Sequence, residues 1–197
     1  MRRRLILCGP VGCGKSTLIR GALGAESARA GGFVTLRRQE GGRLLGFDLA
    51  PARVLACPEG ERAGRRFLEL SDGVTRHDWV FEDYGTALLQ DGASSPFAVA
   101  DEFGGLELLL PRFGRALTAL LEGDIPCVGV LKAPEGARAL AEKAGLGEEY
   151  LKRAAALKDR LERDPDTLLL PTAGRGDRKA EELLRRWADR YVRGEGP

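Results

Sequence analysis

The sequence predicts an α/β fold, a three-layer sandwich in which helices cover both faces of a mainly parallel sheet with an added antiparallel hairpin. Two observations predict the parallel part: short apolar runs recur along the 197 residues, and amphipathic helical segments separate them. Strands that alternate with helices form parallel sheets with right-handed crossovers. A third observation predicts the hairpin, because two β-type runs flank Gly41-Gly42, a turn sequence typical of antiparallel strands. The length fits a single domain over residues 1–197.

Four apolar runs are predicted to be buried strands of the parallel sheet. The first ends in a glycine-rich turn, and the second runs directly into two acidic residues. Short apolar runs of this kind are typical of strands that are covered on both faces. The predicted strands are residues 5–8, 96–100, 126–131 and 168–170, and the hairpin strands are residues 32–38 and 43–49.

Helices are predicted where apolar residues recur at helical spacing. Gly145 and Gly147 interrupt one long helical stretch, which is therefore predicted to form two helices. The predicted helices lie within residues 16–23, 80–89, 111–122, 135–163 and 179–192. Residues 50–78 are rich in Gly, Arg and Glu, and we expect a loop there with one strand near residues 66–70.

The composition is that of a soluble globular protein, with 43% hydrophobic and 30% charged residues. A net charge of +2 gives no reason to expect a nucleic-acid or membrane partner. The four cysteines show no Cys-x-x-Cys spacing and His77 is the only histidine, so the usual zinc ligands are missing. The first apolar run is too short for a signal peptide or membrane span. We expect a cytoplasmic protein with small, buried, reduced cysteines.

The segment after the first strand reads GPVGCGKS, the G-x-x-x-x-G-K-S pattern of a phosphate loop. In such a loop the backbone N–H groups surround the β-phosphate, and the following helix directs its positive end at the anion. Lys15 is expected to reach the β- and γ-phosphates, and the Ser16 hydroxyl to ligate Mg²⁺. The motif predicts the P-loop NTPase form of the sandwich. Its nucleotide-binding residues are Gly9, Pro10, Val11, Gly12, Cys13, Gly14, Lys15 and Ser16.

A second motif is the apolar run Phe97–Ala100, which ends in Asp101-Glu102. An apolar strand that ends in an acid is typical of a Walker B element, whose aspartate holds the Mg²⁺ shell. Sheet geometry would place these acids beside the phosphate loop. Glu102 could then polarise the water that attacks the γ-phosphate. The alternative is a pair of solvated acids at a strand end.

Some arginines in or after predicted loops are candidates for stabilising the transition-state charge, although a solvated surface charge is the favoured interpretation for any single one of them. They are Arg112, Arg138, Arg175 and Arg178. Residues 170–176 follow the last predicted strand, where a base-contacting or arginine-bearing loop often lies. The sequence contains no asparagine and therefore no Asn-Lys-x-Asp loop, which argues against a Ras-like GTPase. It also lacks a Leu-Ser-Gly-Gly signature, which argues against an ABC-type ATPase.

Three segments together resemble the small nucleoside-triphosphatases that include the cancer-related nucleoside-triphosphatase and its thermophile relatives. They are the GPVGCGKST loop, residues 32–35 leading into residues 42–47, and residues 100–108. The resemblance covers about the first two-thirds of the chain. It implies slow, Mg²⁺-dependent hydrolysis of ATP, GTP and other nucleoside triphosphates. It also implies that Gly9–Thr17 bind phosphate and Mg²⁺, and that Asp101–Gly104 complete the site. The sequence departs from the family pattern at Ala100 and Phe103, and at Leu131-Lys132, where a histidine is common.

The favoured hypothesis is a nucleoside-triphosphate hydrolase with water as the nucleophile. Lys15 and the loop amides hold the phosphates, Ser16 and Asp101 (the latter through water) hold Mg²⁺, and Glu102 orients the attacking water. Catalysis would rest on positioning and electrostatics. One alternative is a phosphotransferase acting on a nucleoside or small alcohol, with residues 50–78 shaping an acceptor pocket. Another is a nucleotide-switched accessory binding protein. Base preference and oligomeric state are not predicted.

Overall fold

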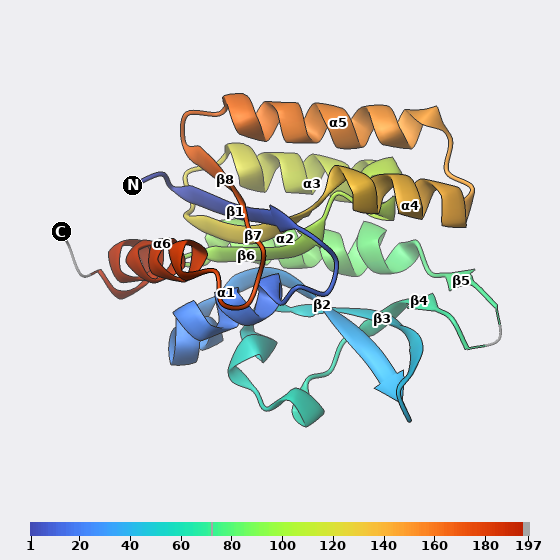
Figure 1. Cartoon of the computed structure of the whole chain (residues 1–197), viewed down its shortest axis with the longest axis horizontal. Helices are drawn as coiled ribbons and strands as arrows, with labels where there is room; N and C mark the ends of the chain where they lie inside the picture. The colour runs from blue at the N-terminus through green and yellow to red at the C-terminus, as the bar shows by residue number, and fades with distance from the viewer. Residues whose placement is uncertain (72, 195–197) are drawn as a thin grey trace.

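The computed structural model describes residues 1–71 and 73–194, and a mixed sheet of eight strands runs through its centre (Figure 1). The order of the strands across the sheet is β5-β4-β3-β2-β6-β7-β1-β8. The strands are β1 (Arg4–Gly9), β2 (Gly31–Glu40), β3 (Arg43–Pro51), β4 (Arg65–Glu69), β5 (Thr75–Arg76), β6 (Ala98–Phe103), β7 (Cys127–Lys132) and β8 (Thr167–Pro171).

The sheet is parallel from β2 to β8 and antiparallel from β2 to β5. This confirms the predicted mainly parallel sheet with an antiparallel hairpin. The hairpin is larger than predicted, because β4 and β5 continue it beyond β3. The predicted strand near residues 66–70 corresponds to β4. The two-residue strand β5 is too short to leave a recognisable pattern in the sequence.

The helices are α1 (Lys15–Leu23), α2 (Thr86–Ser94), α3 (Pro111–Glu122), α4 (Pro134–Ala144), α5 (Glu148–Arg163) and α6 (Arg178–Ala188). The predicted helix at residues 80–89 is confirmed and is longer, since a helical turn at Val80–Gly85 continues into α2. The predicted break in residues 135–163 is confirmed as well. Gly145 ends α4 with a φ of 62°, a left-handed conformation that glycine adopts without steric cost.

Two apolar cores cover the two faces of the sheet, because successive strand residues point to opposite sides. Leu5 and Leu7 of β1 pack on α1 and α6, in a core that contains Ile19 and Trp187. Ile6, between them, faces the core formed with α2, α3 and α5. Figure 1 shows α1 and α6 on one side of the sheet and α3 and α5 on the other, which is the predicted three-layer sandwich.

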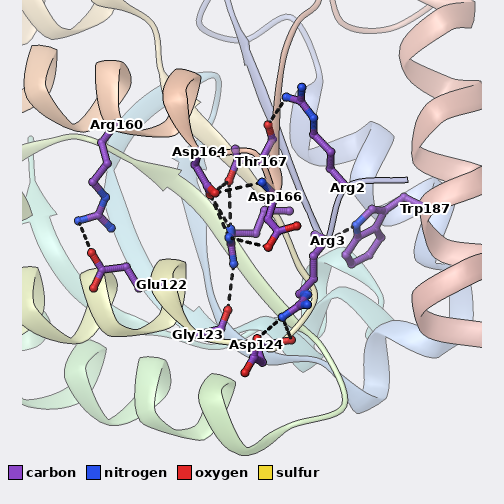
Figure 2. A network of polar contacts seen from close by, with 11 residues as sticks. Arg2, Arg3, Glu122, Gly123, Asp124, Arg160, Asp164, Asp166, Thr167 and Trp187 are labelled. Carbon is purple, nitrogen blue, oxygen red and sulfur yellow. Dashed lines mark hydrogen bonds and ion pairs between the residues drawn. The ribbon is translucent and has the colours of Figure 1, made fainter.

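A network of hydrogen bonds and ion pairs around Arg4 connects the amino-terminal ends of β1 and β8 (Figure 2). Arg4 is only 4% exposed, and its guanidinium donates to Asp164 Oδ2 at 3.1 Å, Thr167 Oγ1 at 3.0 Å and the Gly123 carbonyl at 2.9 Å. A buried charge is stable only when it is paired and hydrogen-bonded, as this one is. The network joins β1, β8 and the turn after α3 at the end of the sheet opposite the phosphate loop.

All four cysteines are free thiols, but their predicted burial is wrong for Cys57, which is exposed on an irregular segment. Cys127 is buried, and Cys8 and Cys13 are partly buried. Within the described part of the chain, no helix has both the length and the apolar character that crossing a membrane requires.

Candidate nucleotide site

The phosphate-loop motif forms a turn between β1 and α1. β1 ends at Gly9, and α1 begins at Lys15 directly after Gly14, whose φ of 95° suits glycine alone. The Lys15 ammonium lies inside the turn and donates to the carbonyls of Gly9 at 2.9 Å and Pro10 at 2.6 Å. The predicted strand–loop–helix context is therefore present, and the free N-terminus of α1 points its positive dipole end into the loop.

The segment after β8 lies directly on this loop. The backbone N–H of Arg175 donates to the Cys13 carbonyl at 2.9 Å. A Cβ added to Gly14 would lie 2.7 Å from Arg175 Cγ, so the arginine side chain runs over that glycine. Of the four arginines singled out from the sequence, Arg175 is the one that the fold brings against the phosphate loop.

Asp177 holds this covering segment in shape. Its carboxylate accepts hydrogen bonds from Thr172 Oγ1 at 2.8 Å and from the N–H of Ala180 at 3.1 Å, where it caps α6. These contacts hold the pKa of Asp177 below its usual value, since they favour the charged form. The backbone of the segment, and with it the position of Arg175, is fixed by this cap.

The other arginine candidates lie elsewhere. Arg112 donates to Asp83 at 2.5 Å, on the helical face formed by α3 and the turn before α2. Arg138 and Arg178 are exposed on α4 and at the start of α6. None of these three lines the hollow beside Ser16 and Glu102 that is described below.

The phosphate loop and the end of β6 meet through two predicted residues. Ser16 Oγ donates to Asp101 Oδ1 at 2.9 Å, and Thr35 Oγ1 of β2 donates to the Asp101 carbonyl at 3.3 Å. Asp101 is only 2% exposed. Burial, followed by the charge of Glu102, raises the pKa of Asp101 to about 7, although the Ser16 hydrogen bond and Lys15 oppose the shift. A buried carboxylate of this kind would gain strongly from a nearby cation.

Glu102 has an unusual backbone conformation. Its φ is 61°, and among the described residues it is the only non-glycine with a positive φ. The register of β6 against β7 also shifts here. Ala100 pairs with Gly129 and Phe103 pairs with Leu131, so β6 has one more residue than β7 between these two pairs. An extra residue of this kind is a β-bulge, which redirects a side chain at a strand end. The bulge turns Glu102 out of the ladder and into the lining of the hollow beside Ser16.

A carboxylate that the motif analysis did not single out supports the turn after β6. Glu107 is 3% exposed, and its Oε1 accepts from the N–H groups of Gly104 at 2.6 Å and Gly105 at 2.7 Å. Tyr150 donates its hydroxyl to the Gly104 carbonyl at 3.0 Å. Both backbone polar groups of Gly104 are thus engaged within the protein. Gly104 shapes the turn, and its place in the nucleotide site remains a proposal.

A hollow of about 440 Å³ opens beside these residues. Ser16 and Glu102 line one end, and Phe47 and Phe67 of the antiparallel strands line the other. Lys132, at the end of β7, lies on its wall. Lys132 could have been suspected from the sequence, because it stands at a strand end, whereas Thr35 lies in the middle of β2. The contribution of the antiparallel strands depends on the tertiary fold, and local patterns do not reveal it.

A protein-family profile described as NTPase matches residues 4–149. The chain belongs to the NTPase family. The matched region runs from β1 into α5, so it contains the phosphate loop, the antiparallel hairpin and Asp101-Glu102. The family membership predicted from these three segments is thereby confirmed, and with it the assignment of this NTPase to the nucleoside triphosphatases.

Two solved structures share the fold of this NTPase. The crystal structure of THEP1 from the hyperthermophile Aquifex aeolicus superimposes with a TM-score of 0.58 at 18% identity, and covers 91% of this chain and 96% of that chain. The solution structure of a human cancer-related nucleoside triphosphatase gives a TM-score of 0.57 at 23% identity, with 93% and 94% covered. At these identities the structures support the fold alone. A search of curated protein sequences finds no match to this NTPase.

Proposed function

We propose that this NTPase hydrolyses ATP, GTP and other nucleoside triphosphates to the diphosphate and phosphate, with Mg²⁺ as cofactor. The observation that carries the proposal is the 2.9 Å contact between Ser16 Oγ and Asp101 Oδ1. This contact brings the phosphate loop and the carboxyl end of β6 into one site, with Glu102 beside them. The proposal specifies no base preference, because the residues of this site are expected to contact the phosphates of the nucleotide.

The oxygen donors at this point fit Mg²⁺. Mg²⁺ prefers hard oxygen ligands and usually combines one or two protein groups with phosphate oxygens and water. Ser16 would bind the ion directly, and Asp101 would hold it through water. When bound, the ion neutralises charge on the β- and γ-phosphate oxygens.

Each remaining residue of the site has a proposed role. The backbone of Gly9–Thr17 surrounds the phosphates, and Lys15 exchanges its two carbonyl partners for phosphate oxygens, which are stronger, charged acceptors. Glu102 orients the attacking water and takes its proton. The water oxygen forms a bond to the γ-phosphorus, the bond from that phosphorus to the β–γ bridging oxygen breaks, and the diphosphate leaves.

Slow turnover is part of the proposal. Arg112, Arg138 and Arg178 lie outside the hollow next to Glu102, and Arg175 lies over Gly14 on the other side of the loop. None of these four is placed to supply the charge that gives an arginine finger its effect of about 10³–10⁵ in rate. Arg37 and Arg76 do line the hollow, and the proposal gives neither of them a role in the reaction. The proposed location is the cytoplasm, since free thiols are usual in a reducing compartment.

Phosphate release measured with ATP, GTP, CTP and UTP in the presence of Mg²⁺ tests this function. Replacing Glu102→Gln should reduce release about 10²–10⁴-fold, the usual contribution of a general base, while binding of a non-hydrolysable MgATP analogue persists. Replacing Lys15→Ala should weaken both binding and release. Glu142→Gln, a change at an exposed position of α4, serves as the control and should match the wild type. Unchanged release in Glu102→Gln would remove that residue from its role.

A further inference from the structure

The hollow beside Ser16 is larger than an attacking water requires. It extends about 440 Å³ from Ser16 and Glu102 to the antiparallel strands, a size within the range of small-molecule sites. Its walls come from α4 and from the β4–β5 segment, which Figure 1 shows extending beyond the carboxyl ends of the parallel strands on the same side. The space continues the proposed nucleotide site and is built largely from residues that the site does not use.

The strand order separates this hollow from the opposite end of the nucleotide. β8 lies on one side of β1, whereas β7, β6, β2 and the antiparallel strands lie on the other. The segment carrying Arg175 covers Gly14 from the β8 side. Ser16 and Glu102, which mark the γ-phosphate end under the proposed function, line the hollow on the other side. The nucleoside of a bound triphosphate would therefore leave the loop toward Arg175, and the hollow lies beyond the γ-phosphate.

The far wall of the hollow is apolar and aromatic. Phe47 and Phe67 stack with ring centroids 6.3 Å apart, and Leu44 and Leu70 lie with them in the lining. Val74 completes the wall and is 61% exposed, an unusual degree of exposure for a branched apolar side chain next to aromatic rings. A wall of this composition suits a flat ring system.

Basic side chains predominate among the charged groups of the same lining. Arg37, Arg76, Lys132 and Lys143 face the two acids Glu102 and Glu107, so the lining carries a formal excess of two positive charges. Arg76 Nη2 is already paired with the exposed carboxylate of Asp78, at 2.9 and 3.1 Å, which offsets one of these charges. Its Nε is buried and has no hydrogen-bond partner among the residues that the structure describes. A buried donor without a partner is costly, and an anionic ligand would supply one.

We propose that this hollow is a second ligand site, which takes a small aromatic molecule bearing an anionic group and holds it beyond the γ-phosphate. The apolar wall receives the ring, and Arg76 of β5 and Lys143 of α4 receive the anion. This proposal rests on the proposed function in one respect, because that function determines which end of the triphosphate faces the hollow. Nucleoside monophosphates have the required size and chemistry and serve as probes.

Isothermal titration of AMP, GMP, CMP and UMP tests the site in two states of the protein. One state is the wild type saturated with a non-hydrolysable MgATP analogue, and the other is Lys15→Ala. At least one monophosphate should bind in both states, since the aromatic wall, Arg76 and Lys143 all lie outside the phosphate loop, although Val11, Gly12 and Ser16 of that loop border the hollow. The parent nucleoside and inorganic phosphate should each bind at least 10-fold more weakly, because each lacks one half of the ligand. Monophosphate binding that the analogue abolishes, or no binding in either state, would overturn the proposal.

Two variants on opposite walls test the assignment of residues. Arg76→Ala and Lys143→Glu should each weaken monophosphate binding about 10-fold while ATP hydrolysis without monophosphate stays near the wild-type rate. Lys143 is exposed at the end of α4, so its replacement leaves the core intact. Arg163→Ala, at the exposed end of α5, is the matched control. Full affinity in both variants would refute the site, whereas normal monophosphate binding without any phosphate release would refute only the proposed hydrolysis.

Discussion

The Ser16 hydroxyl donates to the Asp101 carboxylate over 2.9 Å, although 85 positions separate the two residues along the chain. One belongs to the first turn of α1 and the other to the end of β6, and β7 lies between β6 and β1 in the sheet. Parallel strands end at the same edge of a sheet, so two distant motifs share one site. Substitutions near this contact are therefore expected to affect phosphate release and the free energy of unfolding in different ways.

The left-handed backbone at Glu102 leads to a prediction about stability. A non-glycine residue in this region stores about 1–3 kcal/mol, part of which glycine would release. Glycine also increases the conformational entropy of the unfolded chain, which offsets part of this gain. The net effect of Glu102→Gly should be a rise in the free energy of unfolding of roughly 0.5–1 kcal/mol. The same variant should lose phosphate release. Urea unfolding measures the first effect, and Glu142→Gly within α4 should show the opposite sign. A less stable Glu102→Gly would mean that the backbone at this position is not strained.

Glu107 leads to a prediction about pH. Burial is the main reason that the pKa of Glu107 lies above its ordinary value of 4.5. The stabilisation from a carboxyl with a raised pKa is complete below that ordinary value and is lost as pH rises through the folded-state pKa. Glu107→Gln retains an acceptor oxygen and has no charge to bury. Its free energy of unfolding should therefore rise relative to wild type between pH 4.5 and pH 8, as followed by urea unfolding. A difference that does not change with pH would contradict the shift.

The two hydrogen bonds that Glu107 accepts lead to a separate prediction. Glu107→Ala leaves the N–H groups of Gly104 and Gly105 buried without their acceptor. Each such group costs about 1–3 kcal/mol, so the variant should be at least ~2 kcal/mol less stable than wild type. Thermal unfolding alongside Glu107→Gln provides the comparison. Equal stability of the two variants would show that water replaces the carboxylate.

Arg175 is predicted to contribute to nucleotide binding. Its side chain crosses Gly14, where a nearby phosphate or ribose would accept a charged hydrogen bond. A bond of this kind at an exposed position contributes about 1–2 kcal/mol, so Arg175→Ala should weaken binding of a non-hydrolysable MgATP analogue roughly 5–30-fold. Arg178→Ala, three residues later and also exposed, is the control for charge. Indistinguishable affinities of the two variants for the analogue would show that Arg175 makes no specific contribution to nucleotide binding.

Arg4 should matter for stability alone. Arg4→Met removes a buried guanidinium and leaves the Asp164 carboxylate without its cation, although Thr167 Oγ1 and the Asp166 N–H still donate to it (Figure 2). Removing one member of a buried ion pair costs about 3–5 kcal/mol. Phosphate release per folded molecule should stay unchanged, because the network lies at the opposite end of the sheet. A loss below about 1 kcal/mol in denaturant titration would contradict this account.

The sequence predicted the central strands well because those strands are buried on both faces and therefore read as uninterrupted apolar runs. It predicted β4 less firmly and missed β5, since short edge strands have little burial to impose a pattern. The phosphate loop and Asp101-Glu102 were found because their spacing is set by local geometry. Their proposed roles await the experiments above.

Other features could not be predicted, because they arise only when distant segments meet. The positive φ of Glu102 runs against the preference of its residue type, so sequence patterns argue against it. The position of Arg175 over the loop depends on β8 pairing beside β1. The aromatic wall of the hollow comes from a hairpin whose continuation into β4 and β5 is weakly patterned.

The covering of the phosphate loop by residues 172–177 also affects the order in which the nucleotide site is assembled during translation. The loop leaves the ribosome before the segment that rests on Cys13 and Gly14. A nascent or prematurely terminated polypeptide thus carries the complete glycine-rich motif without its cover. Nucleotide that contacts this cover can stabilise the chain only once residues 172–177 have been synthesised, so we expect its influence to fall on the docking of β8 and α6.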